Sequence, residues 1–228
     1  MLGAASTVHA SVGFGTALVV MPLLVPLLGF AVATPLVGLA ALFSVLMVLG
    51  REWRALAPRA AARLLVATLP GIPLGAALVM LAPSSWLRAG LGVLLVAYGG
   101  WSLARPRLPR LAEGRSVYVF GFLAGLLGGA YNTNAPPLVL YGALVRWPPA
   151  RFRATLSGYF LFAAAAICLG HALSGLWTAR VLTLLAYAAP VIVAGNLSGA
   201  WLARRIPQAR FTVVLYALLV LLGALMLA

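Results

Sequence analysis

The sequence has almost no acidic residues and only one cysteine. Glu52 and Glu113 are the only carboxylates among the 228 residues, and both lie in arginine-rich connectors. Catalysis by paired carboxylates and metal binding by a carboxylate cage are therefore excluded. Cys168 alone excludes an internal disulfide and a zinc site built from several thiolates. We expect no enzymatic activity, no catalytic residues, no metal and no cofactor.

Charged surface is also scarce, because 64% of the residues are hydrophobic and only 8% are charged. This composition, with a mean hydropathy of +1.10, excludes a soluble domain and places the chain in a lipid bilayer. The net charge of +14 comes from 16 basic residues, all arginines, mostly in short connectors between apolar runs. Arginines spread in this way indicate membrane topology rather than a nucleic-acid-binding face. We expect membrane lipid as a partner and no nucleic acid.

Six apolar runs are long enough to cross a bilayer as helices. They lie at 31–50, 60–82, 86–104, 154–175, 181–203 and 210–228. Two further apolar segments, 2–28 and 117–145, are interrupted by glycine, small polar residues and proline. A polar, proline-bearing linker at 105–116 divides the chain into a first membrane repeat, 1–104, and a second, 117–228.

The two halves share a register of small residues and prolines. A shift of 121 residues relates Ala33-Thr34 to Ala154-Thr155. A shift of 124 residues relates five more pairs: Gly71 and Gly195, Gly75 and Gly199, Ala76 and Ala200, Pro83 and Pro207, Gly99 and Gly223. Small residues four apart allow membrane helices to approach closely. We interpret the halves as two copies of one structural unit.

The arginines indicate how the two copies are oriented. If segments 2–28 and 117–145 are re-entrant hairpins, 14 arginines lie on one side of the membrane and two on the other. If both segments cross, the division is nine to seven. Basic residues concentrate on the cytoplasmic side, so we favour six crossings of the inner (plasma) membrane with both termini periplasmic or extracellular. Two half-length helices that cross in series are the alternative.

The predicted fold is therefore an all-α polytopic membrane protein of two inverted repeats. Each repeat has a broken, re-entrant helical hairpin followed by three transmembrane helices. Inversion agrees with the connectors, because equivalent connectors of the two halves carry opposite arginine bias.

The two interruptions are the candidate binding site. Backbone that leaves a helix at membrane depth needs protein or a watery cavity around its polar groups, and paired breaks mark substrate sites in transporters. A helix that begins there presents free N–H groups and about half a positive charge, which suits a small anion. The candidate binding residues are Gly13, Phe14, Gly15, Thr16, Asn132, Thr133, Asn134 and Pro136.

Local chemistry gives several of these residues a role. Asn134 is placed to cap the second helix, with Pro136 in the first turn. Gly13 and Gly15 allow backbone to approach a ligand closely, and Thr16 can cap or donate. The alternative is that glycine and proline merely kink two membrane helices.

Four other polar residues are additional candidates. His9 and His171 can carry a coupling proton, because an imidazole titrates near neutral pH; His171 can equally be an interfacial residue. Asn196 lies in an apolar run, where its amide either joins helices or meets substrate. Tyr131 precedes the second break and either packs or presents its hydroxyl.

The stretch from Gly121 to Tyr141, followed by Ala154-Thr155, resembles the second-half signature of the TauE/SafE sulfite exporter family. The stretch from Gly13 to Leu24, followed by Ala33-Thr34-Pro35, resembles the first-half signature. Thr16-Ala17-Leu18 and Ala135 stand where that family usually has glycines. The resemblance covers essentially the whole chain. It implies export of sulfite, thiosulfate or organosulfonates through a site lined by the two motifs.

These observations predict a secondary carrier that moves a small sulfur-containing anion by alternating access. No phosphate-binding loop is present, so the energy comes from an ion gradient, the membrane potential or the anion's own gradient; the coupling ion and any homo-oligomeric state are left open. The alternatives are a passive anion channel or a membrane subunit that supports another complex. A lipid-modifying enzyme needs a nucleophile–base pair or metal ligands, which two distant histidines and one cysteine do not supply.

Overall fold

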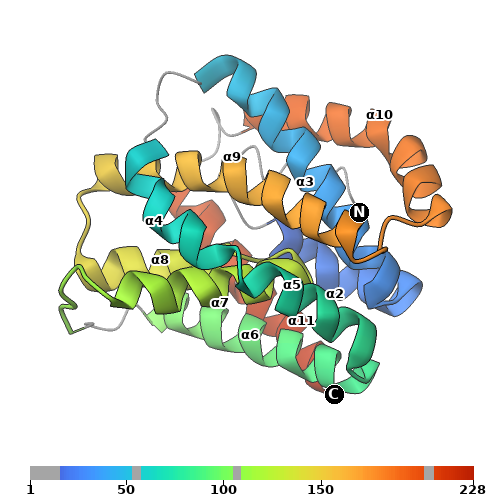
Figure 1. Ribbon diagram of the computed structural model, residues 1–228, viewed down its shortest axis with the longest axis horizontal. Coiled ribbons are helices and arrows are strands. Elements are labelled where there is room, and N and C mark those ends of the chain that lie inside the picture. Colours follow the sequence, from blue (N-terminus) through green and yellow to red (C-terminus); the bar gives the residue numbers. More distant parts are fainter. Residues whose placement is uncertain (1–15, 53–57, 105–108, 203–207) are drawn as a thin grey trace.

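The computed structural model describes residues 16–52, 58–104, 109–202 and 208–228 (Figure 1). Over these ranges every regular element is an α-helix and no strand is present. The helices are α2 (Thr16–Leu28), α3 (Phe30–Glu52), α4 (Pro58–Thr68), α5 (Gly71–Leu81), α6 (Ser84–Ala104), α7 (Ser116–Tyr131), α8 (Ala135–Val145), α9 (Pro149–Leu173), α10 (Ala179–Leu202) and α11 (Gln208–Leu227). The prediction of an all-helical protein is confirmed.

Each predicted crossing run coincides with a helix of the structure. Helices α3, α6, α9, α10 and α11 each cover one run, and α4 and α5 together cover the run at 60–82. Among the described residues, Ala61–Leu81, Ser84–Ala104 and Pro149–Leu173 are long and apolar enough to span a bilayer. Large apolar side chains such as Leu81 and Leu173, each at least 80% exposed, cover the outside, as contact with lipid requires. The protein is membrane-embedded.

Helices α4 and α5 are one apolar stretch that bends at Pro70. Proline has no N–H and its ring obstructs the preceding turn, so the helix is interrupted at Leu69–Pro70. The Leu69 N–H still donates to Leu65 O at 3.2 Å, and the Thr68 hydroxyl donates to Leu64 O at 2.8 Å. The bend brings Thr68 to the surface on which α7 packs.

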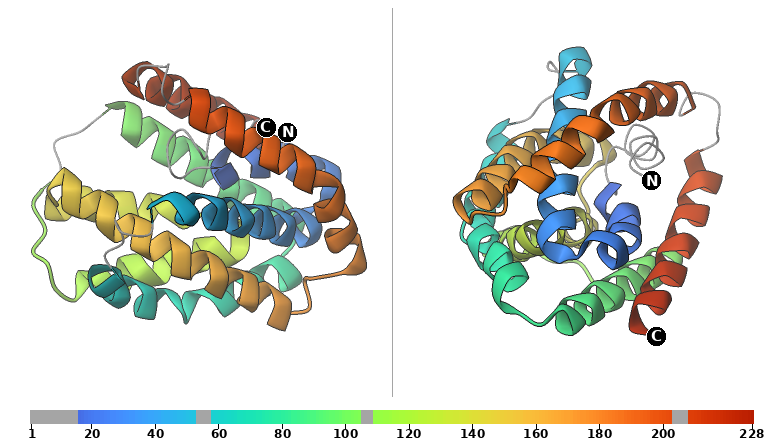
Figure 2. Two further views of the ribbon diagram at one scale, coloured as in Figure 1. Left: turned by 90° about the horizontal axis from the view of Figure 1, so that it is seen from above. Right: turned by 90° about the vertical axis from the view of Figure 1, so that its right-hand side faces the viewer.

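Helices α7 and α8 form an antiparallel hairpin (Figures 1 and 2). The Leu111 N–H, before α7, donates to Leu144 O near the end of α8 at 2.9 Å, so the chain enters and leaves the hairpin at the same end. Helix α7 ends just before Asn132, which has left-handed backbone angles, φ 52° and ψ 31°. Helix α7 has 16 residues and α8 has 11, so each arm is shorter than the roughly 20 residues that a crossing helix needs.

The glycines of α7 allow it to pack closely against α4 and α5. A Cβ at Gly125 would collide with the Thr68 carbonyl and lie 3.1 Å from Gly71 Cα; a Cβ at Gly75 would lie 2.9 Å from Gly129 Cα. Backbones this close require the missing side chains on both helices. The small-residue spacing noted in the sequence therefore marks a real helix contact, and α7 lies against α4 and α5 along its length.

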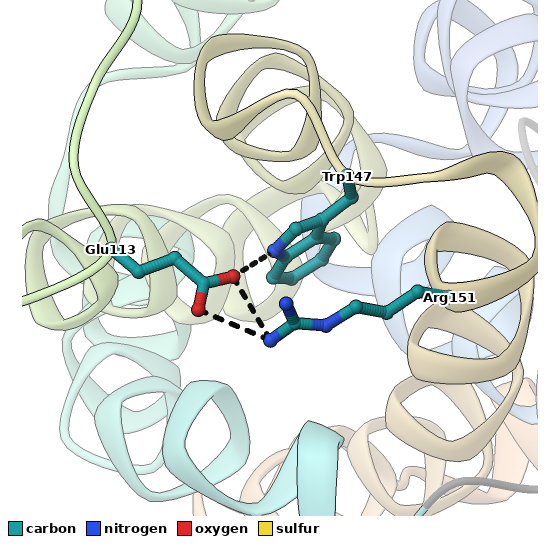
Figure 3. A network of polar contacts seen from close by, with 3 residues as sticks. All are labelled: Glu113, Trp147 and Arg151. Atoms are coloured by element: carbon teal, nitrogen blue, oxygen red, sulfur yellow. Dashed lines mark hydrogen bonds and ion pairs between the residues drawn. The ribbon is translucent and has the colours of Figure 1, made fainter.

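An exposed polar network closes the open end of the hairpin (Figure 3). The Trp147 indole N–H donates to the Glu113 carboxylate, and Arg151 forms an ion pair with it at 2.9 Å. The Arg151 guanidinium also lies over the Trp147 ring, 5.3 Å from its centroid. The network joins the residues before α7, the end of α8 and the first turn of α9. The Trp147 hydrogen bond, and then Arg151, hold the pKa of Glu113 below its usual value.

Glu113→Gln is expected to lower the free energy of unfolding only slightly, on the order of 0.5 kcal/mol, because exposed ion pairs contribute little. A depressed carboxylate pKa contributes stability that is present above its ordinary value of 4.5 and is lost as pH falls through the folded value. Thermal melting in detergent should therefore separate wild type from variant at pH 7, and the difference should vanish in acid. A difference that grows in acid would contradict the assignment; Arg151→Gln is the matched partner variant.

Two pairs of helices, each with one helix from each half of the chain, pack antiparallel. A Cβ at Gly92 of α6 would lie 2.9 Å from Gly223 O of α11, and one at Gly99 would lie 2.9 Å from Tyr216 O. Numbers rise along α6 as they fall along α11, so the two helices are antiparallel. Helices α3 and α9 also lie side by side and run in opposite directions (Figure 2, left). The buried core forms two clusters, and the break between α7 and α8 lies where they adjoin.

Candidate functional site

The carbonyl groups of α7 at the break between α7 and α8 all accept hydrogen bonds. The last carbonyls of a helix have no partners within it and need donors from elsewhere. Here two backbone N–H groups and three side chains supply them. The pairs are Thr133 N to Leu127 O (3.1 Å), Asn132 N to Gly128 O (2.8 Å), His171 Nε2 to Gly129 O (2.9 Å), Thr34 Oγ1 to Ala130 O (3.0 Å) and Thr133 Oγ1 to Tyr131 O (3.1 Å).

His171 of α9 lies directly against this break and is fully buried, with 0% exposure. Its side chain therefore faces neither water nor lipid at the surface of the bundle. Because a carbonyl only accepts hydrogen bonds, Nε2 carries the proton that is donated to Gly129 O. In the neutral ring Nδ1 is then an acceptor, and it has no hydrogen-bond partner within the described part of the chain.

Gly38 of α3 closes the other side of this group. A Cβ on Gly38 would lie 3.3 Å from His171 Nδ1 and 3.3 Å from Asn132 Oδ1. The imidazole and the amide therefore converge on the glycine from two different helices. The Thr34 hydroxyl, one turn earlier on α3, fixes that helix to the break through Ala130 O.

Asn134 holds the N-cap position of α8 as predicted, but its side chain makes no capping hydrogen bond. The predicted cap is wrong for a clear reason. A capping side chain accepts from the second or third helical N–H, and Pro136 and Pro137 occupy those places without an N–H. The Asn134 amide instead interacts with the Tyr159 hydroxyl. That hydroxyl also lies 2.9 Å from the Thr68 hydroxyl.

The remaining candidates are placed as follows. Pro136 is buried in the first turn of α8, and Thr133 is buried with its hydroxyl turned back onto the break. The Tyr131 side chain reaches toward α6, where its hydroxyl would lie 2.7 Å from a Cβ on Gly90. Four candidates (His9, Gly13, Phe14 and Gly15) and the side chains of Thr16 and Asn196 lie outside what the structure describes. Helix α2 begins at Thr16, the first residue that the structure describes.

Sequence reasoning did not place Gly38, Thr34, Thr68 or Tyr159 at this site. Thr34 and Gly38 are four residues apart, which puts both on one face of α3. This spacing is the one feature of the sequence that could have shown that the two residues share a face. No signal in the sequence paired either residue with α9.

The surroundings of the break are uncharged. Residues 116–145 contain no acidic or basic side chain, and no cluster of metal-ligating side chains is present among the described residues. Electrostatic character therefore comes from amides, hydroxyls, the His171 ring and the start of α8, whose dipole is positive at that end.

Comparison with known proteins shows the family of the chain. The profile of the family described as Sulfite exporter TauE/SafE matches residues 1–226. A Cupriavidus necator protein named "Probable sulfite/organosulfonate exporter TauE" is 30% identical over 222 residues, which covers 91% of this chain and 82% of that protein. No solved structure matches the chain. The resemblance seen in the two motifs is thereby confirmed, and the chain belongs to the TauE/SafE sulfite exporter family.

Proposed function

We propose that the protein is a secondary carrier that exports a small sulfur-containing oxyanion or sulfonate across the inner membrane by alternating access. The observation that carries the proposal is the uncharged, amide-bearing break between α7 and α8 inside an apolar helical bundle. The chemical class of the cargo follows the name of the Cupriavidus necator relative, a probable sulfite/organosulfonate exporter.

An anion suits the break better than a cation. The carbonyl oxygens at the end of α7, which attract cations, already accept hydrogen bonds from His171, Thr34 and the turn itself. The Asn132 and Asn134 amides and the start of α8 supply donors and partial positive charge. Helix starts that point at anionic groups are a known arrangement in transporters with broken helices.

The inverted repeats that the sequence predicts support the alternating-access part of the proposal. Helices α6 and α11, which the 124-residue shift relates, pack antiparallel. Thr34 and Thr155, which the 121-residue shift relates, are both fully buried. Halves of opposite orientation can exchange conformations and expose one site alternately to each side. We propose that Gly13 to Thr16 provide the matching break of the first half.

The hairpin geometry supports re-entry rather than crossing. Both ends of the α7–α8 hairpin lie at the end of the bundle where Glu113 meets Arg151. Helix α7 is about 24 Å long at 1.5 Å per residue, shorter than the ~30 Å hydrocarbon layer. We propose that this arginine-bearing end is cytoplasmic, with both chain termini on the opposite side.

Asn134→Ala is expected to slow transport roughly 10- to 100-fold, the effect of losing one hydrogen bond to a charged ligand. Purified protein in liposomes should dissipate a sulfite or methanesulfonate gradient, saturate with concentration and show counterflow. Tyr159→Phe is the control, because it removes the hydroxyl that Asn134 contacts but keeps the amide. Equal slowing by both variants would assign Asn134 a structural role only.

The same assay separates the alternatives. A passive channel gives flux without saturation or counterflow, and a supporting subunit gives no flux alone. Either outcome would remove the carrier proposal.

A further inference from the structure

We propose that His171, Asn132 and Gly38 form a subsite for one oxygen of the anion, and that His171 Nδ1 takes up one proton when the anion binds. The inference rests on the proposed function and adds the coupling ion to it. One proton would then accompany each anion through the membrane.

His171 is held so that only one of its ring nitrogens can change state. Nε2 donates to Gly129 O at 2.9 Å, and this bond persists in both the neutral and the charged ring, because Nε2 is protonated in each. Nδ1 is fully buried and has no hydrogen-bond partner among the residues described. Such an orphaned buried nitrogen is costly unless a ligand or a proton engages it at some stage. A buried polar atom of this kind therefore points to a missing partner.

His171 Nδ1 faces the backbone of Gly38. Nδ1 and Asn132 Oδ1 both lie 3.3 Å from the place where a Gly38 side chain would begin. The Asn132 amide can turn over and present its NH₂ group there instead of its oxygen. Protonated Nδ1 and that NH₂ group would then form two donors for a single oxyanion oxygen. Without the added proton, Nδ1 is an acceptor and repels the same oxygen.

Few other groups can take the proton instead. Helix α3 up to Leu46 and helix α5 have no ionisable side chain. On α7, Tyr131 turns toward Gly90 and Tyr118 is exposed at the far end of the helix. Arg63 of α4 and Arg151 of α9 act on Glu113, and Arg151 is 20 residues, about 30 Å, along α9 from His171. Cys168 and Tyr159 are the titratable neighbours on α9 itself, both neutral near pH 7.

The proposed transport step conserves both atoms and charge. Neutral His171, one anion and one proton from the same side give an imidazolium–anion pair, and both are released together on the other side. For a monovalent anion this cycle moves no net charge. A membrane potential would not act on it; the anion's own outward gradient would drive export, and an inward proton gradient would oppose it.

Methanesulfonate is the sharpest probe, because it stays a monoanion throughout the pH range used and any pH dependence belongs to the protein. In wild type, affinity measured by ligand-dependent thermal shift should fall about tenfold per pH unit above the histidine titration. In liposomes, methanesulfonate flux should carry protons, detected by an internal pH dye, and should not respond to an imposed potassium-diffusion potential.

His171→Gln places an amide nitrogen near the Nε2 position and keeps a donor for Gly129 O, but it removes the titrating atom. We expect weaker binding at pH 6, at least tenfold, with a flat pH profile. Cys168→Ala is the matched control, since it removes a buried titratable group one turn earlier on α9. It should keep the wild-type profile.

Gly38→Ala tests the subsite without replacing either polar residue. Alanine favours the helix more than glycine does, so the melting temperature should not fall by much, while the methyl group occupies the subsite and binding should be lost. Normal binding by this variant, or a wild-type pH profile in His171→Gln, would overturn the inference and leave the carrier proposal intact. No binding or transport of sulfite or methanesulfonate by wild type at any pH would overturn both.

Discussion

Gly125→Ala is expected to prevent stable folding, with a loss of about 3 kcal/mol or more in the free energy of unfolding. The added methyl group would overlap the Thr68 carbonyl and lie 3.1 Å from Gly71 Cα. Both contacts are backbone atoms that no change of rotamer can move. Overpacking of this kind costs ~1–3 kcal/mol where side chains can adjust, and more where only the helices can separate. Separation would also break the hydrogen bond from Thr68 to Gly121 O.

Gly100→Ala is the matched control, because Gly100 is also helical and a Cβ there has no atom within 4 Å among those described. It should melt at or slightly above the wild-type temperature, by the helix preference for alanine. Size-exclusion chromatography after heating in detergent measures both variants in one experiment. A Gly125→Ala protein that elutes as a single peak and melts like wild type would show that α7 does not need this contact.

The helices could be predicted from the sequence because the bilayer leaves few choices. An apolar run of about 20 residues must satisfy its backbone internally, and a helix does so. The second break could be located for a related reason. Pro136 and Pro137 cannot donate within a helix, and Asn132 is among the few residue types that tolerate left-handed angles.

The tertiary partners of the break could not be predicted. Gly38 has no side chain, which leaves room for His171 and Asn132 beside it. Hydropathy does not indicate which helices supply the residues that lie there. His171 looked equally suited to the interface, because its position near the end of α9 does not reveal that α7 lies against it. The capping error was avoidable, since the two prolines that mark the helix start also remove the N–H groups that a cap needs.

The five carbonyls at the end of α7 explain why the site needs several helices. A break within the membrane leaves acceptors that water cannot reach, and one turn of backbone supplies only part of the donors. The Thr133 hydroxyl supplies one more, and Thr34 and His171 supply the last two from α3 and α9. The residues that stabilise the break therefore also surround it. In His171, for example, Nε2 stabilises the break and Nδ1 has the proposed binding role.

Asn132→Asp is expected to reduce anion affinity about a thousandfold at pH 7.5 while the protein still folds. Aspartate has the shape of asparagine and tolerates left-handed backbone, so the turn at φ 52° is retained. A carboxylate about 4 Å from an anion at an effective dielectric of 20 repels it by ~4 kcal/mol, which corresponds to about three decades in affinity. The carboxylate would also pair with protonated His171 and remove that donor from the ligand.

Asn132→Gly separates charge from the loss of the amide. Glycine adopts the same backbone angles without strain, and we expect a decrease of roughly tenfold, the contribution of one neutral hydrogen bond. Ligand-dependent thermal shift with methanesulfonate compares the two variants directly, with the ligand-free melting temperature as the test of folding. Asn132→Asp affinity within a factor of ten of Asn132→Gly would mean that the anion does not approach Asn132, because a charge introduced beside a bound anion in a buried site cannot be without effect.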